Sequence, residues 1–171
     1  MLESLDSWLQ PWAAYVADHQ ALAITITAIH VLAMFTAGGL AVATDRRVLA
    51  VMTSSLRTDP TVRRLTLEEL ASSHAIVIAA LAVTFSSGLM LLGADLATFT
   101  ASPVYWAKMS AIVLLLLNGI RLRLAERRLR TMAPDQDRAL AASTGALRQS
   151  AAVSLVLWFT IVLLGVTLGN S

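Results

Sequence analysis

The feature that most constrains this chain is a set of four apolar segments, each close to the length that crosses a bilayer. They cover residues 21–44, 70–92, 104–120 and 151–168, and a helix needs about 20 apolar residues to cross a hydrocarbon core of about 30 Å. Only 14% of the 171 residues are charged, against about 25% in soluble domains. The sequence therefore predicts one all-α domain, an integral membrane protein with four transmembrane helices and the lipid bilayer as its surroundings.

The basic residues predict how these helices are oriented. Twelve of the thirteen are arginines, and all twelve lie in residues 46–64 or 121–148. Arginine and lysine are enriched in cytoplasmic loops, so both stretches are predicted to be cytoplasmic. We therefore expect a multi-pass protein of the bacterial inner (cytoplasmic) membrane, with its N- and C-termini outside the cytoplasm. The arginines are not interleaved with aromatic residues as in base-binding surfaces, so no nucleic-acid partner is expected.

Helix signals refine the predicted boundaries. The transmembrane helices are expected at about 20–44, 67–93, 104–131 and 136–169, including cytoplasmic extensions, and short connections favour an antiparallel four-helix bundle. Asp59 before Pro60 is typical of a helix start. A capping-box pattern from Thr66 to Glu69 nevertheless predicts that the second membrane helix starts near residue 67. On the extension of the third helix, residues 126 and 130 form a Glu–Arg pair at i,i+4 spacing.

The N-terminal stretch carries a further helical pattern. Leucine and tryptophan at helical spacing over residues 2–17 predict a short N-terminal helix at the outer membrane interface.

Small residues mark where membrane helices approach closely. The predicted contact stripes are Ala23, Ala33, Ala37 and Ala41 on the first helix, Ala71, Ala75, Ala79, Ala82 and Ser86 on the second, and Ala151, Trp158 and Gly165 on the fourth.

Histidines at membrane depth are the main functional signal, because polar side chains there cost free energy. His30 lies on the small-residue stripe of the first helix, and a neutral imidazole can ligate haem or a metal or carry a proton. A hydrogen bond to a neighbouring hydroxyl is the structural alternative. His74 is the second candidate haem or metal ligand, at a level that differs from that of His30 by roughly 10 Å. Met34 lies closer to the level of His74, so a His/Met ligand pair is geometrically easier, with core packing as its alternative.

Two polar residues of the third helix complete the candidate site. Lys108 is the only lysine, and it either extends its amine to the outer headgroups or points inward to pair with a propionate or another anionic group. Asn118 lies deeper, near the level of His74, where it contributes to the site or bonds across to a neighbouring helix. The chain has no cysteine, which excludes disulfides, iron–sulfur ligation and c-type haem attachment.

Two segments resemble a group of small bacterial membrane proteins. The run from His30 to Gly39, with a histidine two turns before a glycine pair, is similar to the first helix of CopD-like and HemJ-type proteins. The run Tyr105-Trp106-Ala107-Lys108, followed by an apolar stretch to Asn118, resembles their third helix. The resemblance implies a haem-associated oxidoreductase acting on protoporphyrinogen or a copper-handling protein. His30 and Lys108 would inherit the polar site of the family.

The chain departs from the HemJ-type pattern at two places. Its first helix ends in Asp45-Arg46-Arg47 where those proteins have a Leu-Pro-Arg stretch, and Asn118 stands near the place of a late histidine. Three functions therefore remain open. The leading hypothesis is a haem b or other redox-active membrane protein. The second is a non-catalytic subunit of a larger membrane complex or a homo-oligomer, and the third is copper or small-solute transport. The residues do not decide whether the chain is an enzyme.

Overall fold

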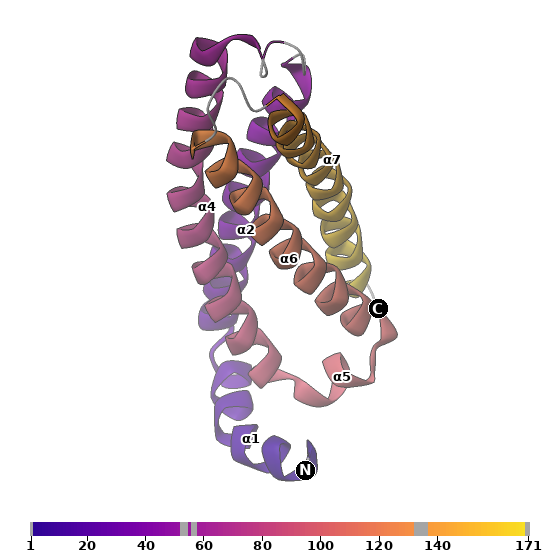
Figure 1. Cartoon of the computed structure of the whole chain (residues 1–171). Helices are drawn as coiled ribbons and strands as arrows, with labels where there is room; N and C mark the ends of the chain where they lie inside the picture. Colours follow the sequence, from indigo (N-terminus) through magenta and orange to yellow (C-terminus); the bar gives the residue numbers. More distant parts are fainter. Residues whose placement is uncertain (1, 52–54, 56–57, 132–136, 170–171) are drawn as a thin grey trace.

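The structure is a computed structural model that describes residues 2–51, 55, 58–131 and 137–169. Within these residues the chain forms six helices, which confirms the all-α fold. The helices α2 (Gln20–Ala50), α4 (Pro60–Ala94), α6 (Pro103–Thr131) and α7 (Asp137–Leu168) are long and apolar enough to cross a membrane. The short helices are α1 (Leu2–Asp18) and α5 (Leu96–Ala101). Successive long helices run in opposite directions (Figure 1).

The bundle consists of two helical hairpins. Helix α2 pairs closely with α4 and α6 pairs closely with α7, while α2 and α7 join the two hairpins. Helices α4 and α6 touch only sparingly, and they converge toward the end of the bundle that holds the predicted cytoplasmic connections (Figure 1). At this arginine-rich end, the guanidinium of Arg130 on α6 donates a hydrogen bond to the carbonyl of Leu67 on α4.

Helix boundaries agree with the sequence analysis except near two connections. Helix α2 continues past residue 44 to Ala50, and α4 begins at Pro60, not near residue 67. The carboxylate of Asp59 accepts hydrogen bonds from the amides of Thr61 and Val62 at 2.8 and 3.1 Å, so the cap before the proline is the real start. Helix α5 was not predicted, and residue 136, the expected start of the last helix, lies outside the described residues.

The outward surfaces of the long helices are apolar. Leu32, Phe85 and Leu163 are each about two-thirds exposed, at 66%, 67% and 67%. Exposed apolar area of this extent is unfavourable in water, whereas helices with all backbone groups bonded internally are suited to lipid. The length and the apolar surface of the four long helices therefore identify the chain as a multi-pass membrane protein.

The predicted contact stripes are correct for two helices and wrong for one. Ala37 on α2 and Ala151 on α7 are fully buried, as expected. The stripe of Ala71, Ala75, Ala79, Ala82 and Ser86 on α4 instead faces outward. The buried face of α4 is a different one, and its residues are Leu67, Leu70, Ala80, Ser87 and Gly93.

Two buried apolar clusters hold the four helices together. The cluster at the arginine-rich end includes Val48, Leu70, Leu129, Leu140 and Leu147. The central cluster has members from all four long helices, and these are Ala37, Ala80, Ala111, Leu115, Trp158 and Ile161.

The N-terminal helix α1 contacts the end of the bundle opposite the arginines. The indole nitrogen of Trp12 donates to the carbonyl of Met90 on α4 at 2.9 Å, and its ring packs against Gly93. Trp8 is 84% exposed. The location of α1 at a membrane interface stays a prediction.

Candidate functional site

Two hydrogen bonds establish the register between α2 and α4. The Nδ1 atom of His30 lies 3.0 Å from the hydroxyl of Ser87, and the hydroxyl of Thr44 lies 3.3 Å from that of Ser73. Both pairs belong to one antiparallel register, so His74 lies beside Thr44 and not beside His30. The distance along α4 from Ser87 to His74 is thirteen residues, or about 20 Å at 1.5 Å per residue.

The two histidines therefore lie in different layers of the bundle. The predicted offset of roughly 10 Å was too small, because it was counted from the ends of the apolar segments and not from the helix pairing. In the observed register Met34 lies opposite Val83, so it is also well removed from His74. His30 and His74 of the same copy would therefore not hold one haem iron together, because about 20 Å of helix separates them.

The Nδ1 atom of His30 points toward hydrogen-bond acceptors on α4. The hydroxyl of Ser87 donates its proton to the carbonyls of Val83 and Thr84, at 2.7 and 3.1 Å, so it can only accept from His30. The Nδ1 atom of His30 then carries the proton, because a neutral imidazole has one N–H and one lone pair. The Nε2 atom is left with the lone pair and has no hydrogen bond within the described residues.

Lys108 points into the same layer as His30. Its side chain is half-buried, its ammonium lies 3.5 Å from the position that a Cβ atom on Gly165 would occupy, and it interacts electrostatically with His30. The ammonium makes no ion pair or hydrogen bond with the residues that the structure describes. We call this group the His30 layer, and its members are His30, Ser87, Gly88, Lys108 and Gly165.

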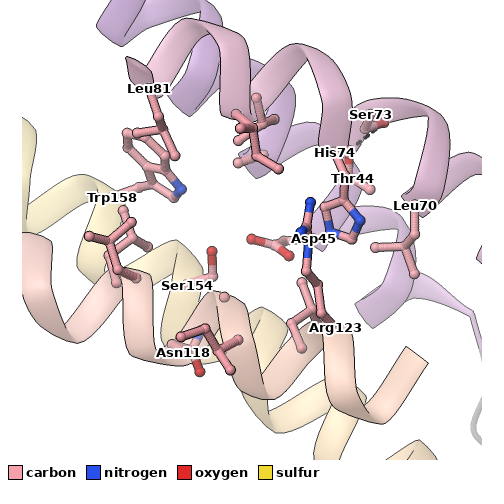
Figure 2. Close-up of a pocket in the computed structure, with 18 residues that line it drawn as sticks. Thr44, Asp45, Leu70, Ser73, His74, Leu81, Asn118, Arg123, Ser154 and Trp158 are labelled. Carbon is pink, nitrogen blue, oxygen red and sulfur yellow. Dashed lines mark hydrogen bonds between the residues drawn. The ribbon is translucent and has the colours of Figure 1, made fainter. Parts of the chain in front are cut away.

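A cavity of about 230 Å³ lies closer to the arginine-rich end, between all four long helices (Figure 2). We call it the Asp45 cavity. Three members of the central apolar cluster lie between it and the His30 layer, and these are Ala37 on α2, Ala111 on α6 and Ile161 on α7. Its polar lining residues are Thr44, Asp45, Ser73, His74, Asn118, Arg123 and Ser154.

Two buried acceptors in this cavity have no hydrogen-bond donor. Asp45 is 3% exposed, and the hydroxyl of Ser154 bonds to its carboxylate, but its Oδ2 atom has no partner among the described residues. Asn118 is 6% exposed and donates from Nδ2 to the carbonyl of Ser150 at 2.7 Å, which confirms the predicted bond across to a neighbouring helix. Its Oδ1 atom is likewise unpartnered in this part of the chain.

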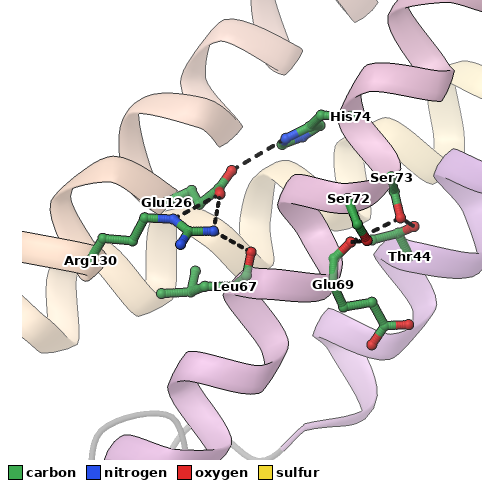
Figure 3. A network of polar contacts seen from close by, with 8 residues as sticks. All are labelled: Thr44, Leu67, Glu69, Ser72, Ser73, His74, Glu126 and Arg130. Carbon is green, nitrogen blue, oxygen red and sulfur yellow. Dashed lines mark hydrogen bonds and ion pairs between the residues drawn. The ribbon is translucent and has the colours of Figure 1, made fainter.

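A polar network connects the cavity to the surface of the bundle (Figure 3). The Nδ1 atom of His74 lies 3.4 Å from Oε2 of Glu126, and Arg130 donates to the other oxygen of Glu126 at 2.8 Å. The predicted pair between Glu126 and Arg130 is therefore confirmed. Sequence reasoning missed that Glu126 is buried, at 6% exposed, and that it bridges α6 to His74 on α4.

Sequence reasoning also missed Asp45, which it placed at the end of the first transmembrane helix and not in a site. A usable signal was present, since Asp45 extends the stripe of Ala33, Ala37 and Ala41 by one more step of four residues. On α6 the same spacing continues from Asn118 through Leu122 to Glu126. Side chains four apart share a helix face, so both carboxylates could have been expected on buried faces.

The described residues contain no group of three or more histidine, cysteine, aspartate or glutamate side chains placed to hold a metal ion. The geometry therefore does not favour the copper hypothesis over the others. No protein-family model, curated protein or solved structure matches this chain.

Proposed function

We propose that this membrane protein binds haem in the His30 layer, with His30 as the single iron ligand from the chain. One observation carries the proposal: His30, oriented by Ser87, lies in the same layer as Lys108, whose ammonium has no ion pair or hydrogen bond among the described residues. A histidine is a common ligand of haem iron, and an ammonium can form a charge-assisted hydrogen bond with the carboxylate of a propionate.

The donor set fits this ligand in a further respect. Histidines that ligate a metal usually donate their other ring N–H to an acceptor, which orients the ring, and Ser87 is such an acceptor for His30. Bound haem would supply one-electron redox chemistry at its iron. The chain's own residues would orient the imidazole through Ser87 and neutralise an anionic group through Lys108.

The first test is the absorption spectrum of the protein purified in mild detergent from haem-replete cells. We expect a Soret band, and the reduced protein should bind carbon monoxide, because His74 lies about 20 Å away and would not serve as a second iron ligand. His30→Ala should remove the band. His74→Ala and His19→Ala should keep it, since neither residue lies in the His30 layer. A colourless wild-type protein would refute haem binding and favour a non-catalytic subunit of a larger complex.

The contact between Ser87 and His30 gives a second prediction. Ser87→Ala should lower haem affinity about 10–100-fold, the usual cost of losing a residue that orients a metal ligand. Ser86→Ala is the matched control, because Ser86 is its neighbour in sequence but is exposed on α4. Titration of apoprotein with haem measures both affinities. Equal affinities for the two variants would show that Ser87 does not orient the ligand.

A further inference from the structure

We propose that the Asp45 cavity is a hydrated proton-transfer site, in which Asp45 exchanges protons with the arginine-rich end through His74 and Glu126. This inference is independent of haem binding, because the cavity and the His30 layer are separated by the central apolar cluster. Ionisable residues at membrane depth that form Asp/Glu/His chains are typical of proton relays.

The first step of the argument is that the cavity must contain hydrogen-bond donors. The unpartnered Oδ2 atom of Asp45 and Oδ1 atom of Asn118 are acceptors, and both residues are more than nine-tenths buried. Buried acceptors are normally satisfied by protein or by ordered water. A cavity of 230 Å³ has room for roughly seven water molecules at about 30 Å³ each. Most of the lining is apolar, so we place water molecules beside Asp45 and Asn118, where they would donate to the two unpartnered acceptors.

The second step is the connection to the outside. His74 lines the cavity and its Nδ1 atom contacts Glu126, which in turn contacts Arg130. Side-chain exposure is 21% for His74, 8% for Glu126 and 38% for Arg130, so Glu126 lies beside a solvated group. Arg130 keeps its proton, and the proton exchange with solvent occurs at the carboxylate of Glu126. Figure 3 shows that this chain of contacts crosses from α4 to α6.

The proton balance of one transfer is simple. A hydronium ion from the solvent gives its proton to the Glu126 carboxylate, which passes it to Nδ1 of His74, and His74 releases a proton from its other ring nitrogen to a water molecule. That water protonates the carboxylate of Asp45. Glu126 ends as a carboxylate, His74 is again neutral, and Asp45 has gained the proton. An imidazole suits the middle position because it can accept at one nitrogen while it donates from the other.

The charges around Asp45 favour water over a metal cation as the occupant. The titratable or charged groups that line the cavity together with Asp45 are His74 from α4 and Arg123 from α6 (Figure 2), while α7 contributes the neutral Ser154 and Trp158. Arg123 makes no ion pair with any described residue, so its positive charge acts on the cavity and repels a cation.

Trp158 provides a reporter for this site because it lines the same cavity as Asp45. In a background with Trp8, Trp12 and Trp106 changed to phenylalanine, Trp158 is the only remaining tryptophan. After a pH jump in detergent, its fluorescence should change as Asp45 gains or loses a proton. Asp45→Asn and Asp45→Ser should both abolish the change, and circular dichroism checks that each variant is folded.

Loss of Glu126 or His74 should slow the fluorescence change of Trp158 without abolishing it. Glu126→Gln and His74→Gln should each lower its rate by about 100-fold, the low end of what a positioned proton donor contributes. Glu69→Gln is the matched control, because Glu69 is a carboxylate at the same end that pairs with Arg47 and does not line the cavity. Wild-type rates in both relay variants would overturn the proposal. So would a response that survives loss of Asp45, the lack of any response in the tryptophan background, or a response to Na⁺ at constant pH.

Discussion

Replacement of Gly38 by leucine is expected to destabilise the protein by about 1–3 kcal/mol, the usual cost of overpacking a closely packed site. A Cβ atom at Gly38 would lie 3.0 Å from Cε3 and 3.2 Å from Cζ3 of Trp158. Trp158 is 5% exposed and belongs to the central cluster, so its ring has little room to move. The substitution should therefore separate α2 from α7, the contact that joins the two hairpins. Thermal unfolding followed by circular dichroism in detergent measures the effect.

Gly39→Leu is a closely matched control for this prediction. No atom lies within 4 Å of the position of a Cβ at Gly39, and glycine costs about 0.8–1.0 kcal/mol relative to alanine in a helix. Gly39→Leu should therefore be neutral or slightly stabilising. Adding Trp158→Ala to Gly38→Leu should recover part of the lost stability. Equal unfolding midpoints for the two leucine variants would mean that α2 and α7 do not pack through Gly38.

Replacement of Arg148 by alanine should cost about 1.5–3 kcal/mol for each hydrogen bond lost from its charged side chain. The guanidinium on α7 donates to the carbonyls of Leu49 and Val51, at 2.9 and 2.6 Å. These groups lie at the end of α2, where the last carbonyls have no partner within the helix. Unfolding should occur at lower temperature, and the amides near residues 46–51 should exchange hydrogen faster by mass spectrometry.

Arg127→Ala provides the comparison for the Arg148 variant. The Arg127 side chain is exposed on α6, and substitutions of this kind usually change stability by less than about 0.5 kcal/mol. Both variants remove one positive charge from the same end of the bundle, so they separate the hydrogen bonds from the effect of net charge. If the two variants unfold at the same midpoint, water satisfies the last carbonyls of α2 and the hydrogen bonds of Arg148 do not stabilise the protein.

Local sequence patterns predicted most of the individual helices. Four apolar segments of sufficient length required four long helices, because a chain in lipid must satisfy its backbone hydrogen bonds internally. Asp59 before Pro60 marked a true helix start, and Asn118 was correctly expected to bond across helices. The errors were also local, since a capping-box pattern at Thr66 was outweighed by the helix already started at Pro60.

The candidate sites depend on how the helices pair. His30 and Lys108 were both singled out from the sequence, but their place in one layer follows from the packing of α2 against α4 and of α6 against α7. The same register puts His74 beside Asp45 and Glu126 and removes it from His30. A slide of one turn between two helices would preserve every apolar stripe and change every polar neighbour.

The sequence by itself thus determined the number, length and lipid-facing character of the helices, because these depend on the composition of contiguous segments. Only the tertiary structure decided which polar side chains meet, and it revealed a cavity at Asp45 that apolar segments alone did not predict. The physical reason is that the register of antiparallel helices is set by contacts such as Gly38 against Trp158 and His30 against Ser87. Those contacts join residues far apart in the chain, and no local pattern encodes them.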